Sequence, residues 1–206
     1  MLDAAALLRT HNVLFVTLDS LRFDVAAALH ETGRIPQLSV HLPRGWEKRH
    51  TPGNFTFAAH AAFFAGFLPT PVASGPHPRL FALEFPGSET TTERTAVFAE
   101  PDIVSGFRAR GYRTICIGGV GFFNKLTPLG RVLPGLFDES HWSPGLGVTD
   151  PRSAEHQVEL AIERVHAGEG RIFLFINISA IHQPNRFYVP GATGDSLASH
   201  AAALEY

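Results

Sequence analysis

The sequence is short of cysteine, of clustered basic residues and of long apolar runs. It has one cysteine, Cys116, so no internal disulfide and no cysteine-rich metal site can form. Its 17 lysines and arginines are scattered among 19 acidic residues, which leaves no electrostatic case for a nucleic-acid partner. No segment approaches the ~20 continuous apolar residues that a membrane span requires.

The N-terminal stretch "MLDAAALLRTHN" has an acid at position 3 and no basic region before its short apolar run, which argues against a signal peptide. The lone cysteine is expected to be a buried core residue, and the two observations together favour the cytoplasm. A chain of 206 residues with 45% hydrophobic content can bury one sizeable core, so we expect a single α/β domain over residues 1–206.

Apolar runs alternate with helical patterns along the chain. Strands are predicted at 13–18, 112–118 and 171–179, and helices at 21–33, 56–66, 102–111, 153–167 and 195–206. Continuously apolar strands that alternate with helices favour a mostly parallel sheet covered by helices on both faces. Residues 69–95 are rich in Pro, Gly, Ser and Thr and are predicted to be a long surface excursion of the kind that often carries function. The last helix has no stop signal before Tyr206, so we expect the sheet to continue in residues beyond it.

Three polar residues stand where predicted strands end or helices begin: Asp19, Thr56 and His182. Ligands of open parallel sheets bind at the carboxyl ends of the strands, so these residues can converge. Asp19 offers a hard oxygen ligand to a divalent cation, and such a cation can make the hydroxyl of Thr56 nucleophilic. A phosphate on Thr56 would also lie against the free N–H groups at the start of its helix.

Each of these residues also has a structural interpretation. Asp19 could cap the helix that begins near Leu21, and Thr56 could cap the helix over 56–66. His60, one turn after Thr56, could be a buried core histidine, and His182 could be a turn residue. The glycines at 118, 119 and 121 lack the full spacing of a dinucleotide-binding loop and favour a tight turn.

Three segments resemble a known family. "NVLFVTLDSLRFD" looks like the first strand and metal-binding loop of the alkaline phosphatase superfamily, in particular its sulfatase-like branch. "TPGNFTFAAHAAFFAGFLP" is similar to the nucleophile region of that branch, and "RIFLFINISAIHQPN" to the strand and His-x-Pro segment that supplies a substrate-pocket histidine. The resemblance covers residues 12–206.

The resemblance implies an alkaline-phosphatase-like fold that lacks its C-terminal part. Asp19 and Thr56 would hold a divalent metal ion (Zn, Mn, Mg or Ca), Thr56 would attack phosphorus, and His60 and His182 would contact the non-bridging oxygens. The family completes its metal site with a later Asp-His pair, and this sequence contains no Asp-His dipeptide. With so few ligands, we expect residues 1–206 by themselves to have little activity.

The resemblance favours hydrolysis of a phosphate monoester or diester. Sulfatases of this branch oxidise Cys or Ser to an aldehyde, and threonine is not expected to yield that group. One alternative is a catalytically inactive relative that acts as a binding module, and a further alternative is a true sulfatase. The expected partner is therefore a small-molecule phosphate or sulfate ester, with no nucleic acid, no membrane and an open oligomeric state.

Overall fold

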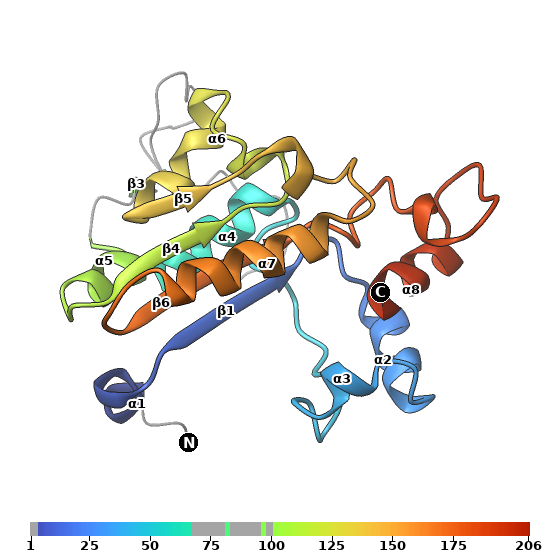
Figure 1. The fold of residues 1–206 in the computed structure, drawn as a ribbon, viewed down its shortest axis with the longest axis horizontal. Helices are drawn as coiled ribbons and strands as arrows, with labels where there is room; N and C mark the ends of the chain where they lie inside the picture. The colour runs from blue at the N-terminus through green and yellow to red at the C-terminus, as the bar shows by residue number, and fades with distance from the viewer. Residues whose placement is uncertain (1–3, 67–80, 83–95, 98–100) are drawn as a thin grey trace.

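A computed structural model describes residues 4–66, 81–82, 96–97 and 101–206 of the chain. Its main sheet has four parallel strands in the order β1-β6-β4-β5 (Figure 1). Their bounds are β1 (Val13–Leu18), β4 (Arg113–Ile117), β5 (Glu139–His141) and β6 (Ile172–Ile178). The α/β class and the parallel sheet are therefore confirmed.

The helices follow the predicted pattern, with additions. They are α1 (Ala4–Thr10), α2 (Phe23–Glu31), α3 (Pro36–Ser39), α4 (Thr56–Ala65), α5 (Ile103–Arg108), α6 (Pro128–Val132), α7 (Ser153–His166) and α8 (Leu197–Glu205). The three predicted strands and five predicted helices are present, whereas α1, α3, α6 and β5 were not predicted, because elements this short carry little periodicity. None of the helices in the described part of the chain is long and apolar enough to span a membrane.

Most of the excursion predicted at 69–95 lies outside the described residues. Two short strands are described near it, β2 (Phe81–Ala82) and β3 (Ala96–Val97). They pair in parallel as a sheet separate from the main one.

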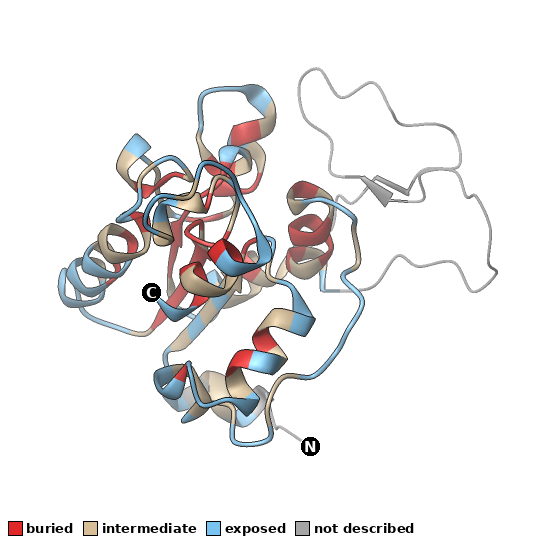
Figure 2. Cartoon of the chain, turned by 90° about the vertical axis from the view of Figure 1, so that its right-hand side faces the viewer, coloured by how far each residue is buried: buried red, intermediate tan, exposed pale blue. Residues whose placement is uncertain are grey.

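Alternation along β6 builds a different core on each face of the sheet. Phe173 and Phe175 join a phenylalanine-rich cluster with α4 and α5. Leu174 and Ile176 join an aliphatic cluster under α7, which crosses in front of the sheet in Figure 1 while α4 lies behind it. Figure 2 shows the buried residues concentrated in the strands and in the helix faces against them. Burial on both faces explains why the strand reads as a continuous apolar run.

Coverage is incomplete over β1, at one edge of the sheet. Its residues alternate between partly buried and exposed, with Leu14 62% and Val16 40% exposed, whereas Phe15 packs against the ring of Phe175. Helices thus cover both faces at β4 and β6, while the α7-side face of β1 remains open in the described structure.

The glycines after β4 serve close packing, which corrects the reason given for them from the sequence. A Cβ atom on Gly118 would lie 2.2 Å from Cβ of Phe123, and one on Gly119 would lie 2.4 Å from the carbonyl oxygen of Asn177. Neither glycine has a positive φ. The missing side chain of Gly119 lets the chain after β4 lie directly against the end of β6, and that of Gly118 leaves room for Phe123.

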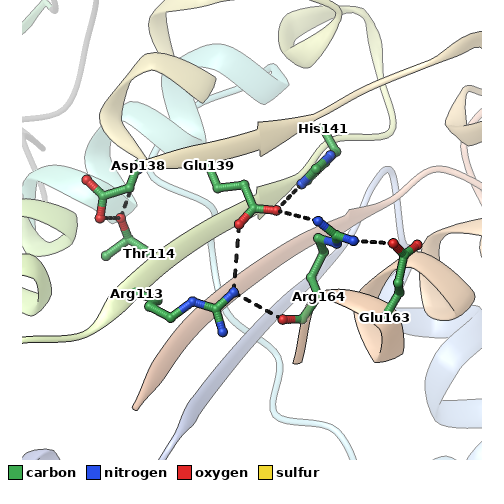
Figure 3. A network of polar contacts seen from close by, with 7 residues as sticks. All are labelled: Arg113, Thr114, Asp138, Glu139, His141, Glu163 and Arg164. Atoms are coloured by element: carbon green, nitrogen blue, oxygen red, sulfur yellow. Dashed lines mark hydrogen bonds and ion pairs between the residues drawn. The ribbon is translucent and has the colours of Figure 1, made fainter. Parts of the chain in front are cut away.

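A polar network joins β4, β5 and α7 at the other edge of the sheet (Figure 3). The carboxylate of Glu139 on β5 contacts Nε2 of His141 at 2.6 Å, Arg164 of α7 at 3.5 Å and Arg113 of β4 at 3.9 Å. Arg113 also donates to the carbonyl oxygen of Arg164 at 3.2 Å. The network fixes α7 over the short β5 strand, which has few apolar contacts of its own.

Candidate functional site

Asp19 directly follows β1 and continues its ladder, since its backbone N–H donates to the carbonyl of Ile178 at 3.1 Å. The side chain is only 7% exposed. Ser20 has a φ of 65°, a left-handed conformation that is uncommon for a residue other than glycine. The capping interpretation of Asp19 is wrong, because α2 begins after Arg22 and has no side-chain cap.

Thr56 is the first residue of α4, so its prediction as the N-cap is wrong. The N-cap is Phe55, with extended backbone angles and no side-chain cap. The Thr56 hydroxyl instead donates to the carboxylate of Asp19, with Oγ1 lying 3.2 Å from Oδ2 and 3.4 Å from Oδ1. The predicted end of the helix is confirmed, since Gly66 takes the left-handed conformation at a φ of 79°. The structure thus brings Asp19 and Thr56 together from positions 37 residues apart.

Asn177 is a site residue that the sequence analysis missed. It lies near the end of β6, is fully buried, and donates from Nδ2 to Asp19 Oδ2 at 3.0 Å and to Thr17 Oγ1 at 3.2 Å. Its Oδ1 accepts the backbone N–H of Val120 at 3.1 Å. The signal available in the sequence was one amide in the otherwise apolar run "IFLFINI". Asn177 holds the Asp19 carboxylate in place.

His60 follows Thr56 by one turn of α4 and is 5% exposed. Its Nδ1 lies 2.7 Å from the carbonyl oxygen of Thr56 and its Nε2 lies 3.0 Å from Oγ1 of Thr17, so both ring nitrogens have protein partners. Rings of Phe63, Phe64, Phe123 and Phe175 surround the imidazole. Burial lowers the pKa of His60, while the hydrogen bond to Thr56 and the nearby Asp19 charge act in the opposite direction. A neutral imidazole that donates from Nδ1 and accepts at Nε2 fits these contacts.

Two cavities meet at Thr56. The first has a volume of about 410 Å³ and is lined by Asp19, Thr56 and His60 among others. The second, of about 220 Å³, is lined by Thr56 and His182 but not by Asp19 or His60. His182 is partly buried, and its Nδ1 lies 2.5 Å from the carbonyl oxygen of Gln183. Three predicted site residues therefore share one cavity, and His182 approaches Thr56 from another side.

The donor set around Asp19 fits a divalent cation only in part. No three His, Cys, Asp or Glu side chains of the described residues gather to hold an ion. The oxygens in contact with one another at this point are the Asp19 carboxylate and the hydroxyls of Thr56 and Ser20, each of which donates to it. Among the described residues Asp19 nevertheless forms no salt bridge, although buried charges are normally paired or bound to metal. One carboxylate with a hydroxyl suits a Mg²⁺-like ion that keeps waters and takes further oxygens from a substrate phosphate.

No family model, curated protein or solved structure matches the chain. The chemistry of the site follows from its own geometry. In this arrangement the hydroxyl of Thr56, at the first turn of a ten-residue helix, can pass its proton to the buried carboxylate of Asp19, and the helix dipole favours an anion nearby.

Proposed function

We propose that this chain carries the nucleophile region of a metal-dependent hydrolase of phosphate monoesters or diesters, with Thr56 as the nucleophile. The observation that carries the proposal is the 3.2 Å hydrogen bond from Thr56 Oγ1 to the buried Asp19 carboxylate, at the wall of a cavity of about 410 Å³. The resemblance of the three segments to the sulfatase-like branch of the alkaline phosphatase superfamily supports the same assignment. Threonine at the attacking position favours phosphate over sulfate chemistry.

Asp19 orients Thr56 and accepts its proton as Oγ1 attacks phosphorus, because the hydrogen bond already points from the hydroxyl to the carboxylate. The ester P–O bond breaks as the new bond forms, and the alcohol leaves with a proton taken from solvent. Water then hydrolyses the phosphothreonine, which releases phosphate and restores the hydroxyl of Thr56. Asn177 prevents Asp19 from turning away by donating to Oδ2. The dipole at the start of α4 stabilises the negative charge that the phosphate brings. A divalent ion bound by Asp19 and Thr56 would neutralise part of that charge and make the hydroxyl more acidic.

We assign different roles to the two histidines. His60 holds the first turn of α4, since its Nδ1 binds the Thr56 carbonyl and its Nε2 binds Thr17. For direct contact with a phosphate oxygen, Nε2 would have to exchange Thr17 for the substrate. His182 lies beside Thr56 in the second cavity and is placed to contact the part of a substrate that extends there.

The proposal is tested by steady-state kinetics on the natural full-length protein with an aryl phosphate monoester, the corresponding diester and an aryl sulfate. Mg²⁺, Mn²⁺, Zn²⁺ and Ca²⁺ are supplied in turn. We expect turnover of a phosphate ester, a loss of at least ~10³-fold in Thr56→Ala, and partial activity in Thr56→Ser, which keeps the hydroxyl. Thr10→Ala is the matched control, because Thr10 is exposed and lines neither cavity.

Elemental analysis of the same proteins separates the alternatives. Stoichiometric metal that is lost in both Asp19→Ala and Thr56→Ala would support a metal site formed by these residues. A protein without metal and without turnover would favour a non-catalytic binding module, and a preference for the aryl sulfate would favour a sulfatase.

A further inference from the structure

The second cavity is lined by Thr56 but not by Asp19. Its volume is about 220 Å³, and Thr56 belongs to its wall as well as to the wall of the first cavity. A phosphorus atom at the Thr56 hydroxyl can therefore direct its oxygens toward the first cavity and one organic substituent into the second. The chemistry of the second wall then selects that substituent.

That wall is mainly apolar. Its large side chains are Val120, Phe122, Leu129 and Val148. His182 is the one titratable residue among the described residues that line it. The hydroxyl of Thr127 already accepts the backbone N–H of Gly130 at 3.0 Å. A sugar or nucleoside would find too few partners for its hydroxyl and amide groups here, and burying such groups unpaired is unfavourable.

Residues of this wall also contact residues that position Asp19 and Thr56. Val120 donates its N–H to Asn177, the residue that holds Asp19. The ring of Phe122 lies 5.9 Å from that of Phe55 and 6.2 Å from that of Phe57, at the start of α4. The cavity is therefore formed by the same contacts that position the site, and it needs little rearrangement to accept a ligand.

The volume sets the size of the group. A dry apolar cavity of ~150 Å³ can hold benzene. At about 220 Å³, this cavity has room for an aromatic ring with a short substituent or for an alkyl chain of several carbons. We propose that the second cavity binds the apolar organic group of the ester, so that the substrates are phosphate esters of an alkyl or aryl alcohol. This inference rests on the proposed function, because the phosphate must lie at Thr56.

The test uses n-alkylphosphonates from methyl to octyl, which carry the phosphate-like head and cannot be hydrolysed. Their dissociation constants are measured by isothermal titration on the natural full-length protein with Mg²⁺ present. Burial of each methylene is expected to tighten binding about three- to fourfold until the cavity is full, after which the constant should level off.

Two variants alter the second cavity without touching the predicted catalytic pair. Gly121 belongs to the wall, and a Cβ there would meet nothing nearer than Nδ2 of Asn124 at 3.9 Å, so Gly121→Val adds apolar volume at a position with room for the new Cβ. Val148→Ser makes the wall more polar. Both should flatten the dependence on chain length and leave the dissociation constant of methylphosphonate within about twofold. The control is Val158→Ser, which changes a valine of α7 that is 47% exposed and should leave the dependence unchanged.

The outcomes separate this inference from the function on which it rests. Binding of methylphosphonate with no gain along the series would overturn the inference and leave the proposed function standing. A gain along the series that persists in both cavity variants would show that the chain binds elsewhere, which also overturns the inference. Failure of every phosphonate to bind would overturn the proposed function, and this inference with it.

Discussion

Replacing Asn177 with alanine should destabilise the protein strongly, because this one side chain connects three parts of the site. It donates to the Asp19 carboxylate and to Thr17, and it accepts the N–H of Val120. The residue is fully buried, so water cannot readily replace these partners. The variant would leave a carboxylate and a backbone N–H each short of a partner in the interior.

The magnitude follows from the three contacts. A hydrogen bond to a charged acceptor contributes about 1.5–3 kcal/mol and a neutral one about 1 kcal/mol. We therefore expect Asn177→Ala to lower the free energy of unfolding by about 3–5 kcal/mol. The measurement is equilibrium unfolding in urea, with the exposed Asn54→Ala as a control that should stay within about 0.5 kcal/mol of the wild type.

Asn177→Asp adds an electrostatic test at the same position. Its new carboxylate would replace an amide that lies 3.0 Å from Asp19 Oδ2, and two such groups cannot both ionise easily. In the folded variant the two carboxyl groups would share a proton, with a pKa above the value in the unfolded chain. The folded variant is therefore more stable when this proton is bound, and that part of its stability is lost as the pH rises. With a chelator present, the urea midpoint of Asn177→Asp relative to that of the wild type should therefore be higher at pH 5 than at pH 8. Two results together would refute the conclusion that Asn177 holds the Asp19 carboxylate. They are a decrease in the free energy of unfolding below about 1 kcal/mol in Asn177→Ala and the absence of this pH trend in Asn177→Asp.

Three further predictions concern groups elsewhere in the core. Because burial lowers the pKa of His60, the folded state binds this proton less readily than the unfolded state. Stability from a neutral His60 should thus be complete above about pH 6.5 and decline as the pH falls, and urea unfolding of His60→Phe should lack this part of the decline. Gly119→Ala should lower the melting temperature by many degrees, whereas Gly135→Ala, with nothing within 4 Å of its added methyl, should not; equal melting temperatures would contradict the close packing. Burial raises the pKa of Cys116, so a thiol reagent should label it only at the rate of unfolding, and rapid labelling of native protein would count against its buried position.

The sequence predicted correctly those features that depend on residues close together in the chain. The apolar runs at 13–18 and 171–179 are strands, and the helix that begins near Thr56 ends at Gly66, where a left-handed residue is required. The capping roles considered for Asp19 and Thr56 were wrong for a physical reason. Both side chains are good caps by preference, but the N-cap positions belong to Arg22 and Phe55, and the hydroxyl of Thr56 donates to Asp19 instead.

The histidines mark the limit of such predictions. From the sequence, His60 was compatible with a core position by its burial preference and with a substrate contact by the family resemblance. Only the structure shows that both its ring nitrogens are engaged by Thr56 and Thr17. His182 was expected, like His60, to contact the non-bridging oxygens of the substrate, and the structure places it in the wall of the second cavity and His60 in the wall of the first.

By itself the sequence determined the elements of a parallel α/β sheet and the polar residues at their ends, since periodicity and end signals are properties of neighbouring residues. The tertiary structure decided the strand order. It inserts β6, the last strand, beside β1, the first, and so brings Asn177 to Asp19 across 158 positions of the chain. Pairing between strands so distant in sequence depends on how two faces of the sheet bury their side chains together, and no local pattern encodes it.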